Sequence, residues 1–297
     1  MINLFLILFM LTSCASYRSS SITSTQTISL KAKTLGSKTH HAAFDEFILN
    51  APNFSVDQYH DGLRPYFHEK KDSYLCNPAA LATALIQDLK SKPDARKLKL
   101  KSIKSEEEID GNALVEELLE CTKTNIVSGA KTANTADCIA GLYKDAGLNY
   151  EVKIIANWSK AGFAHIDKGI NIVYEYPTTA DIIKYLKEGY HIIGSIDMYV
   201  PDENLNWISK GGHVVNINGY ARQKNWPKNL LYLYITDPDF NYGPSEFPRY
   251  HQALLSESKV TKNLPRWQNG LFLEGGTFMG LKQRAFLSGL LIFKIKS

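Results

Sequence analysis

The sequence lacks several features that would place it in a specialised class of protein. Its amino-terminal apolar run, residues 2–11, is too short to span a bilayer as a mature helix. There is no internal repeat, and the net charge of +4 is too small to indicate a nucleic-acid partner. A chain of 297 residues with 44% hydrophobic and 22% charged residues is instead typical of an ordinary globular protein with a real core.

Cysteine is also scarce, with four in the chain, and the first of them has a distinctive context. The apolar run ends in LTSC, residues 11–14, and the sequence then turns polar, which is the pattern of a secretory signal. A Leu three places before Cys14, with small residues between them, resembles a bacterial lipoprotein signal in which Cys14 is lipidated. The run has no Lys or Arg before it, so a plain signal peptide is the alternative.

The sequence around Cys14 leads to an expected location for the protein. We expect a lipoprotein signal peptide at residues 1–13 and a protein carried in the bacterial cell envelope, on the membrane through its N-terminal lipid. Ala15 and Ser16 resemble an outer-membrane sorting pattern.

Residues 14–43 are rich in Ser and Thr and poor in large apolar side chains, which predicts a flexible tether. His40 and His41 lie in it, but adjacent histidines in such a segment are usually solvated, so no metal site is expected. The remaining residues, 44–297, form the predicted folded domain.

Cys121 and Cys138 allow two interpretations. An exported compartment favours disulfides, and the two residues lie in neighbouring predicted helices, so a bridge between them is conceivable. Equally, both can be buried as small apolar side chains. In either case we expect Cys76 to stay free.

The order of the predicted elements indicates an α+β fold, with helices first and an antiparallel sheet after them. The helix that begins near Cys76 is expected to pack on that sheet, and residues 241–275 are interpreted as a long loop. Helices are predicted at 78–89, 112–123, 135–146 and 180–188, and strands at 150–155, 190–199, 213–220, 230–235 and 289–295.

Cys76 lies where chemistry is possible, at the N-terminus of the helix that starts with Asn77-Pro78. The helix dipole and the backbone N–H groups there favour a thiolate. A thiolate nucleophile needs a base beside it and a third group to orient that base. His213, behind two glycines at a strand start, and Asp237, at the end of the next strand, are the candidates.

Strand spacing predicts a contact between these two residues. If the two strands form a hairpin with Tyr220 opposite Leu230, then His213 lies opposite Asp237, with Cβ atoms roughly 4.5–5.5 Å apart. Asp239 is the second choice if the register shifts. Taken singly, each residue has a structural interpretation, since a Cys before a helix is usually structural and Asp-Pro commonly opens a turn. Their order along the chain is harder to explain by chance.

That order resembles the papain-like cysteine peptidases, and in particular their bacteriocin-processing-peptidase-like (double-glycine-leader-peptidase-like) branch. The motifs that carry the resemblance are PYFHEKKDSYLCNPAAL, LKEGYHIIGSI, GGHVVNINGY and YLYITDPD. The resemblance implies a papain-like fold with Cys76 as nucleophile, His213 as general base and acid, and Asp237 as the orienting acid. It implies neither a metal nor an organic cofactor.

One position departs from the family pattern. The family has a Gln several residues before the Cys that stabilises the oxyanion, and this chain has His68, Glu69 and Lys70 there. A Glu69 carboxylate would repel an oxyanion, whereas His68 or Lys70 could donate a hydrogen bond beside the Cys76 N–H. Loss of one such donor typically costs about 10²–10³ in turnover.

The leading hypothesis is therefore an exported, lipid-anchored cysteine peptidase or amidase that hydrolyses a peptide or protein substrate through a Cys thioester. Two alternatives remain open. An acyltransferase would use the same Cys–His–Asp set with an amine acceptor. A catalytically inactive binding lipoprotein on this fold would explain the missing Gln.

Overall fold

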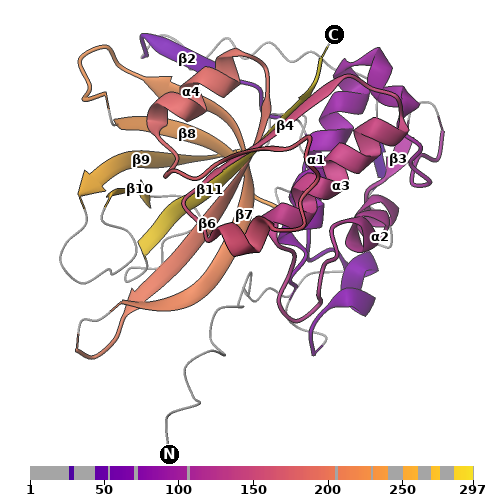
Figure 1. Cartoon of the computed structure of the whole chain (residues 1–297), viewed down its shortest axis with the longest axis horizontal. Coiled ribbons are helices and arrows are strands. Elements are labelled where there is room, and N and C mark those ends of the chain that lie inside the picture. Colours follow the sequence, from indigo (N-terminus) through magenta and orange to yellow (C-terminus); the bar gives the residue numbers. More distant parts are fainter. Residues whose placement is uncertain are drawn as a thin grey trace, which may run out of the picture.

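The sheet predicted for the second half of the chain is present and dominates the molecule (Figure 1). The structure, a computed structural model, has helices and sheet in the mixed α+β arrangement that the sequence predicts. It describes residues 27–29, 44–52, 54–69, 73–105, 108–204, 207–228, 230–239, 250–259, 269–274 and 284–296.

The strands of the large sheet follow the order β10-β9-β8-β7-β6-β11-β4-β5, with β2 added to β7. Strand β11 also pairs with β10, so the sheet closes on itself, and of the described pairs within it only β4–β5 is parallel. Its strands are β2 (Glu46–Leu49), β4 (Tyr150–Ala156), β5 (Asn171–Val173), β6 (His191–Pro201), β7 (Trp207–Arg222), β8 (Leu230–Thr236), β9 (His251–Lys259), β10 (Asn269–Glu274) and β11 (Arg284–Ile295).

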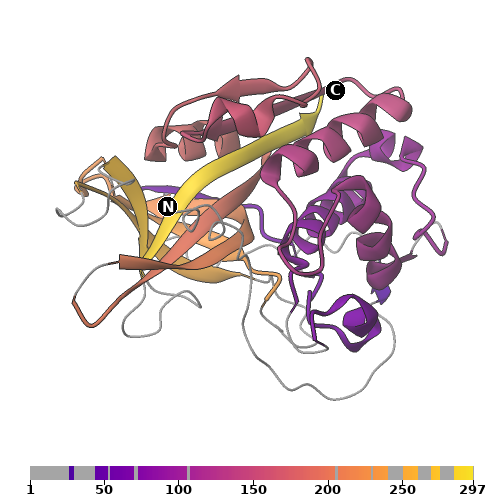
Figure 2. The same ribbon diagram turned by 60° about the horizontal axis from the view of Figure 1, so that its bottom comes forward.

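Three helices stand beside this sheet, and a fourth lies against another part of it (Figures 1 and 2). They are α1 (Cys76–Ser91), α2 (Gly111–Cys121), α3 (Thr132–Asp145) and α4 (Thr179–Lys187). The short 3₁₀ helices are η2 (Asp61–Tyr66), η3 (Pro93–Lys97) and η4 (Lys160–Phe163). A separate two-stranded pairing joins β1 (Thr27–Ser29), within the predicted tether, to β3 (Glu108–Asp110).

Local sequence explains where the helices begin. Pro78 occupies the first turn of α1, where its missing N–H costs no intrahelical bond. At α4 the Thr178 side chain accepts from the Asp181 N–H, while the Asp181 carboxylate accepts from the Thr178 N–H, a capping box. Most residues of α1 are buried, which is typical of a helix inside a core rather than on its surface.

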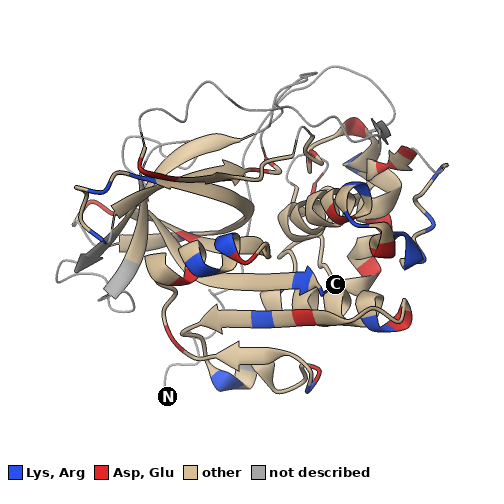
Figure 3. Cartoon of the chain, turned by 90° about the horizontal axis from the view of Figure 1, so that it is seen from above, with Lys and Arg blue, Asp and Glu red and all other residues tan. Residues whose placement is uncertain are grey.

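Two apolar cores result, one between α1–α3 and the sheet and one between the sheet and α4. Lys and Arg are interspersed with Asp and Glu over the helices and the edges of the described chain (Figure 3). Within the described ranges, no helix combines the length and the apolar character needed to cross a membrane.

The structure corrects one part of the predicted layout. Strands β9 and β10 lie within the stretch interpreted as a long loop, residues 241–275, and both are paired in the large sheet. The predicted signal peptide at 1–13, Cys14 with Ala15 and Ser16, the His40–His41 pair and Lys70 lie outside the described residues.

Candidate active site

Strands β7 and β8 bring His213 and Asp237 into direct contact. The Nε2 atom of His213 lies 2.6 Å from Oδ1 of Asp237. His213 is 5% exposed and Asp237 1% exposed, so the pair is removed from solvent. A buried imidazole–carboxylate pair is the orienting half of a nucleophile–base–acid set.

The contact forms in a register that differs from the predicted one. Before the bulge in β7 between Ile217 and Gly219, Asn216 pairs with Thr236, two residues further along β8 than predicted, and the bulge adds a third, so that Tyr220 pairs with Leu233 rather than with Leu230. A bulge inserts an extra residue into one strand and shifts all pairings beyond it. The predicted register is therefore wrong, although the predicted partner of His213 is found.

Asp237 still reaches His213 because β8 ends one residue earlier, at Thr236. The chain then turns, and Oδ1 of Asp237 accepts the Asp239 backbone N–H at 2.9 Å. Such a bond from a side chain to the backbone two residues on is what Asp provides in turns. Asp239, the second choice for the residue that orients His213, thus donates its backbone N–H to Asp237, and Asp237 contacts His213.

Beside the bulge, at Gly219, β2 pairs closely with β7. A Cβ atom at this position would lie 2.2 Å from the carbonyl oxygen of Ile48. Only glycine allows two backbones to approach so closely. The glycine of the NGY motif therefore has a structural role next to the site.

The surroundings of His213 favour its protonated form. Burial alone lowers the pKa of His213, but the charge of Asp237, their hydrogen bond and the charge of Asp239 together raise it above the ordinary 6.5. An imidazolium held by two carboxylates is the partner that a cysteine thiolate needs.

Cys76 is the first residue of α1, and α1 packs on β7, the strand that carries His213. The Asn216 side chain donates to the Ala80 carbonyl at 3.0 Å, one helical turn beyond Cys76 and three residues beyond His213. Further along, Asn50 accepts from the Gln87 side chain and donates its N–H to the Asn218 carbonyl, both at 2.7 Å. The helix and β7 therefore run in the same direction, and Cys76 precedes Ala80 on α1 as His213 precedes Asn216 on β7.

The bonding of Cys76 differs from the expectation of a free thiol. Cys76 is buried and held in a disulfide, and no cysteine of the described chain is free. Since only a thiolate can attack a carbonyl group, chemistry at Cys76 requires this bond to be reduced first.

Gln58 is a buried site residue that the sequence analysis missed. Its N–H donates to the Pro238 carbonyl at 2.9 Å, and its carbonyl accepts from the Ser73 hydroxyl at 2.9 Å. Its side-chain Nε2 donates to Asp239 at 3.3 Å. Gln58 therefore joins the segment leading into Cys76 to the turn after Asp237. The expected position of the Gln is a few residues before the Cys, whereas Gln58 lies further upstream, with η2 between it and Cys76.

The residues predicted in place of that Gln lie elsewhere. Glu69 has a side chain that is 76% exposed and lies 3.7 Å from His68, and its backbone φ is 49°. The His68 ring packs against Tyr74, with ring centroids 6.1 Å apart. The structure does not bring Glu69 to the buried pair, and Lys70 is outside the described residues.

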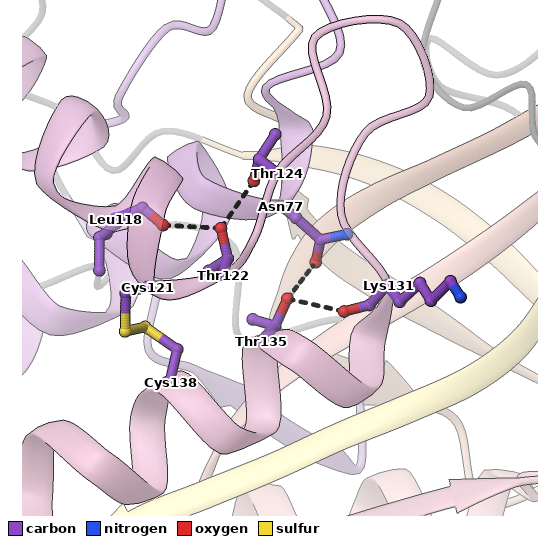
Figure 4. The surroundings of a disulfide bond; sticks show 8 residues. All are labelled: Asn77, Leu118, Cys121, Thr122, Thr124, Lys131, Thr135 and Cys138. Atoms are coloured by element: carbon purple, nitrogen blue, oxygen red, sulfur yellow. Dashed lines mark hydrogen bonds between the residues drawn. A yellow bond between two sulfur atoms is a disulfide. The ribbon is translucent and has the colours of Figure 1, made fainter. Parts of the chain in front are cut away.

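Cys121 and Cys138 form a disulfide, which was one of the two interpretations of this pair; the other was two buried apolar thiols. Cys121, at the end of α2, is bonded to Cys138 in α3, with Cα atoms 5.2 Å apart (Figure 4). The bridge holds the two helices together beside the start of α1. In the described part of the chain, no cluster of three or more His, Cys, Asp or Glu side chains is arranged to hold a metal ion.

No protein-family model and no curated protein sequence matches this chain at a significant level. The interpretation of the site therefore depends on its own geometry.

Proposed function

We propose that the chain is a papain-like cysteine peptidase or amidase that uses Cys76, His213 and Asp237. The observation that carries the proposal is the buried His213–Asp237 pair, 2.6 Å apart, in which His213 belongs to β7, the strand on which α1, the helix that begins at Cys76, packs. The sequence order of the three residues and the contact of His213 with Asp237 are independent arguments for the same set.

The arrangement suits acyl transfer through a thioester. With the Cys76 disulfide reduced, Nδ1 of His213 takes the thiol proton, because Nε2 is engaged by Asp237. The thiolate attacks the amide carbonyl, and the imidazolium returns the proton to the leaving nitrogen, so that an amine departs and a thioester remains. Water, deprotonated by His213, then releases a carboxylic acid and restores the thiol.

The oxyanion that forms during attack needs hydrogen-bond donors. The Cys76 N–H lies at the N-terminus of α1, where the first backbone N–H groups of a helix have no partner within the helix. We propose it as the first donor. We assign the second donor to the Gln58 amide, which is 1% exposed and anchored on both sides of the site. This assignment replaces His68, Glu69 and Lys70 in that role.

A second candidate function is a binding lipoprotein with no catalytic activity. The disulfide at Cys76 favours it, because a permanently bonded sulfur cannot act as a nucleophile. An acyltransferase would share the thioester and differ only in its acceptor, so product analysis with and without an added amine separates it from a hydrolase. In each case the proposed location is the cell envelope. A lipid on Cys14 would occupy its sulfur in a thioether, so the lipidated protein is proposed to carry Cys76 outside a disulfide.

The deciding experiment is the pH dependence of Cys76 alkylation by iodoacetamide in the reduced protein. We expect fast reaction well below the ordinary thiol pKa of about 8.5, and loss of this fast reaction in His213→Ala. Peptide mass mapping assigns the label to Cys76, and Cys76→Ala is the blank. Slow reaction with an ordinary pKa in both proteins would favour the binding lipoprotein.

A further inference from the structure

A buried amide lies in the contact between β7 and α1. Asn216 is 3% exposed, and its side-chain Nδ2 donates to the Ala80 carbonyl at 3.0 Å. Val214, two residues before Asn216 on β7 and therefore on the same face, belongs to the same apolar core as Ala79 and Ala84 of α1. The hydrogen bond of Asn216 is thus a polar, directional contact within an apolar interface.

The helix does not need this bond to satisfy its own backbone. Ala80 lies inside α1, where a carbonyl accepts the N–H of the residue four positions further on. Its second lone pair accepts the amide of Asn216. The amide, by contrast, is buried, and a buried donor that loses its acceptor is destabilising. The contact between α1 and β7 is therefore most favourable at the position where Asn216 meets Ala80.

Apolar packing alone defines such a position poorly. The burial of apolar area is non-directional, so two apolar faces can shift past one another while they remain buried. A hydrogen bond requires a set distance and angle, and one buried polar residue is known to fix the register of packed helices. We expect the bond between Asn216 and Ala80 to oppose movement of α1 along β7 in the same way.

The bond lies only a few residues from both proposed catalytic residues. Cys76 is four residues before Ala80, about 6 Å along the helix axis. His213 is three residues before Asn216, about 10 Å along the strand. Because α1 and β7 run in the same direction, a shift of α1 along β7 moves Cys76 relative to His213 by a similar distance. A misplacement of about 1 Å can slow a reaction between two groups about 100-fold.

Other side-chain bonds hold α1 to other elements. The Asn77 side chain donates to the Ala130 carbonyl at 2.8 Å, in the segment just before α3. At the other end of α1, the Gln87 side chain donates to the Asn50 carbonyl at 2.7 Å, in an exposed position. Asn216, by contrast, joins α1 directly to β7 through a buried bond.

We propose that Asn216 is a positioning residue, whose bond to α1 sets the distance between the Cys76 sulfur and the His213 imidazole. The inference rests on the proposed function, to which it adds a residue that controls the reactivity of the thiol without contacting the substrate. Loss of the bond should weaken the Cys76–His213 pair while the fold stays stable. The fold is expected to tolerate an apolar replacement, because no buried donor is left unpaired and Ala80 keeps its partner within the helix.

The test measures the pH dependence of Cys76 alkylation by iodoacetamide in the full-length protein, together with the urea midpoint of unfolding. Cys76 is reduced under mild conditions, and mass mapping verifies that the disulfide between α2 and α3 remains bonded. The variants are Asn216→Val and, without added bulk, Asn216→Ala. The matched control is Gln87→Leu, which removes an amide–carbonyl bond from the other end of α1. His213→Ala gives the rate of the thiol without its base.

We expect the wild type to react fast well below the ordinary thiol pKa of about 8.5. Both Asn216 variants should lose about tenfold or more of that fast rate and approach the rate of His213→Ala. The urea midpoint of Asn216→Val should stay the same or rise, since a buried polar group is replaced by an apolar one. Gln87→Leu should keep the wild-type pH profile.

Asp88→Ala separates positioning from stability, because it removes a buried carboxylate at the far end of α1 and should lower the urea midpoint. A fast reaction retained in this less stable variant, together with its loss in the Asn216 variants, supports the inference. A wild-type pH profile in the Asn216 variants, or an equal loss of rate in Gln87→Leu or Asp88→Ala, overturns this inference alone. A wild-type Cys76 that reacts as an ordinary thiol overturns the proposed function and this inference with it.

Discussion

At the scale of single residues, the charge around His213 is the feature with the clearest chemical consequence. Its pKa lies above 6.5, because Asp237 and Asp239 outweigh the effect of burial. A raised folded pKa means that the pair stabilises the fold fully below pH 6.5, the ordinary value, and that this contribution is lost as pH rises through the folded pKa.

Replacing Asp239 by Asn should therefore lower the pKa of His213. The imidazolium would then deprotonate at lower pH, and the alkaline limb of Cys76 acylation would move to lower pH with it. The ring proton of His213, followed by NMR through a pH titration, measures the shift directly. Asp94→Asn, which alters an exposed carboxylate on η3, is the control and should change nothing. An unmoved His213 titration in Asp239→Asn would contradict the assigned role of Asp239.

Replacement of Gln58 and replacement of Glu69 are expected to affect stabilisation of the oxyanion differently. Removal of an oxyanion donor costs about 10²–10³ in turnover, so Gln58→Ala should slow acylation of Cys76 by p-nitrophenyl acetate by that factor. Glu69→Ala should leave the rate unchanged, because its side chain is 76% exposed. Iodoacetamide alkylation forms no oxyanion and should be the same in both variants. A normal acylation rate in Gln58→Ala would return the role to the residues near His68.

At the scale of elements, α1 depends on a buried charge at its far end. Asp88 is 0% exposed and contacts His191 at 2.6 Å, Lys92 at 2.7 Å and Tyr143 at 3.0 Å. Burial alone would raise the pKa of Asp88, but His191 and Lys92 hold it well below its ordinary range. The network ties the C-terminal part of α1 to α3 and β6.

Asp88→Ala should lower the free energy of unfolding by about 3–5 kcal/mol, the usual cost of removing one member of a buried ion pair. Urea unfolding at neutral pH measures it, with Asp94→Ala as the surface control. The wild-type contribution is present above pH 3.8, the ordinary value for Asp, and is lost as pH falls toward the lowered folded pKa. The difference between wild type and variant should therefore shrink in acid, and a difference that does not depend on pH would contradict this account.

At the scale of the whole molecule, the proposed site lies where the helical group meets the closed sheet. Cys76 belongs to the core shared by α1–α3 and the sheet, and His213 belongs to β7, on which α1 packs. In the proposed mechanism, the redox state of Cys76 decides whether the site can act.

Alkylation of the full-length protein at Cys76 should therefore require a reductant. Without it, the disulfide blocks the sulfur, and with it, labelling should reach one equivalent at Cys76. Intact-mass measurement counts the labels, and Cys76→Ala gives the background. Complete labelling of Cys76 in the absence of reductant would show that the bond is not held in solution.

Local patterns in the sequence determined much of the architecture. The start of α1 at Cys76, the Thr178 cap of α4 and the strands that became β4, β6, β7, β8 and β11 all follow from patterns a few residues long. Such patterns depend on backbone propensity, capping and alternating burial, which act between neighbours in sequence. The types of residue needed for a thiol site were also visible in this way.

Tertiary structure decided which of those residues meet. Gly219 is required by the close approach of β2, and β2 is far from β7 in sequence. For the same reason Gln58 could not be recognised as a neighbour of Asp239, nor Asn77 as an anchor of Ala130. Strand register and long-range hydrogen bonds follow from how distant segments pack, and no local pattern encodes that packing.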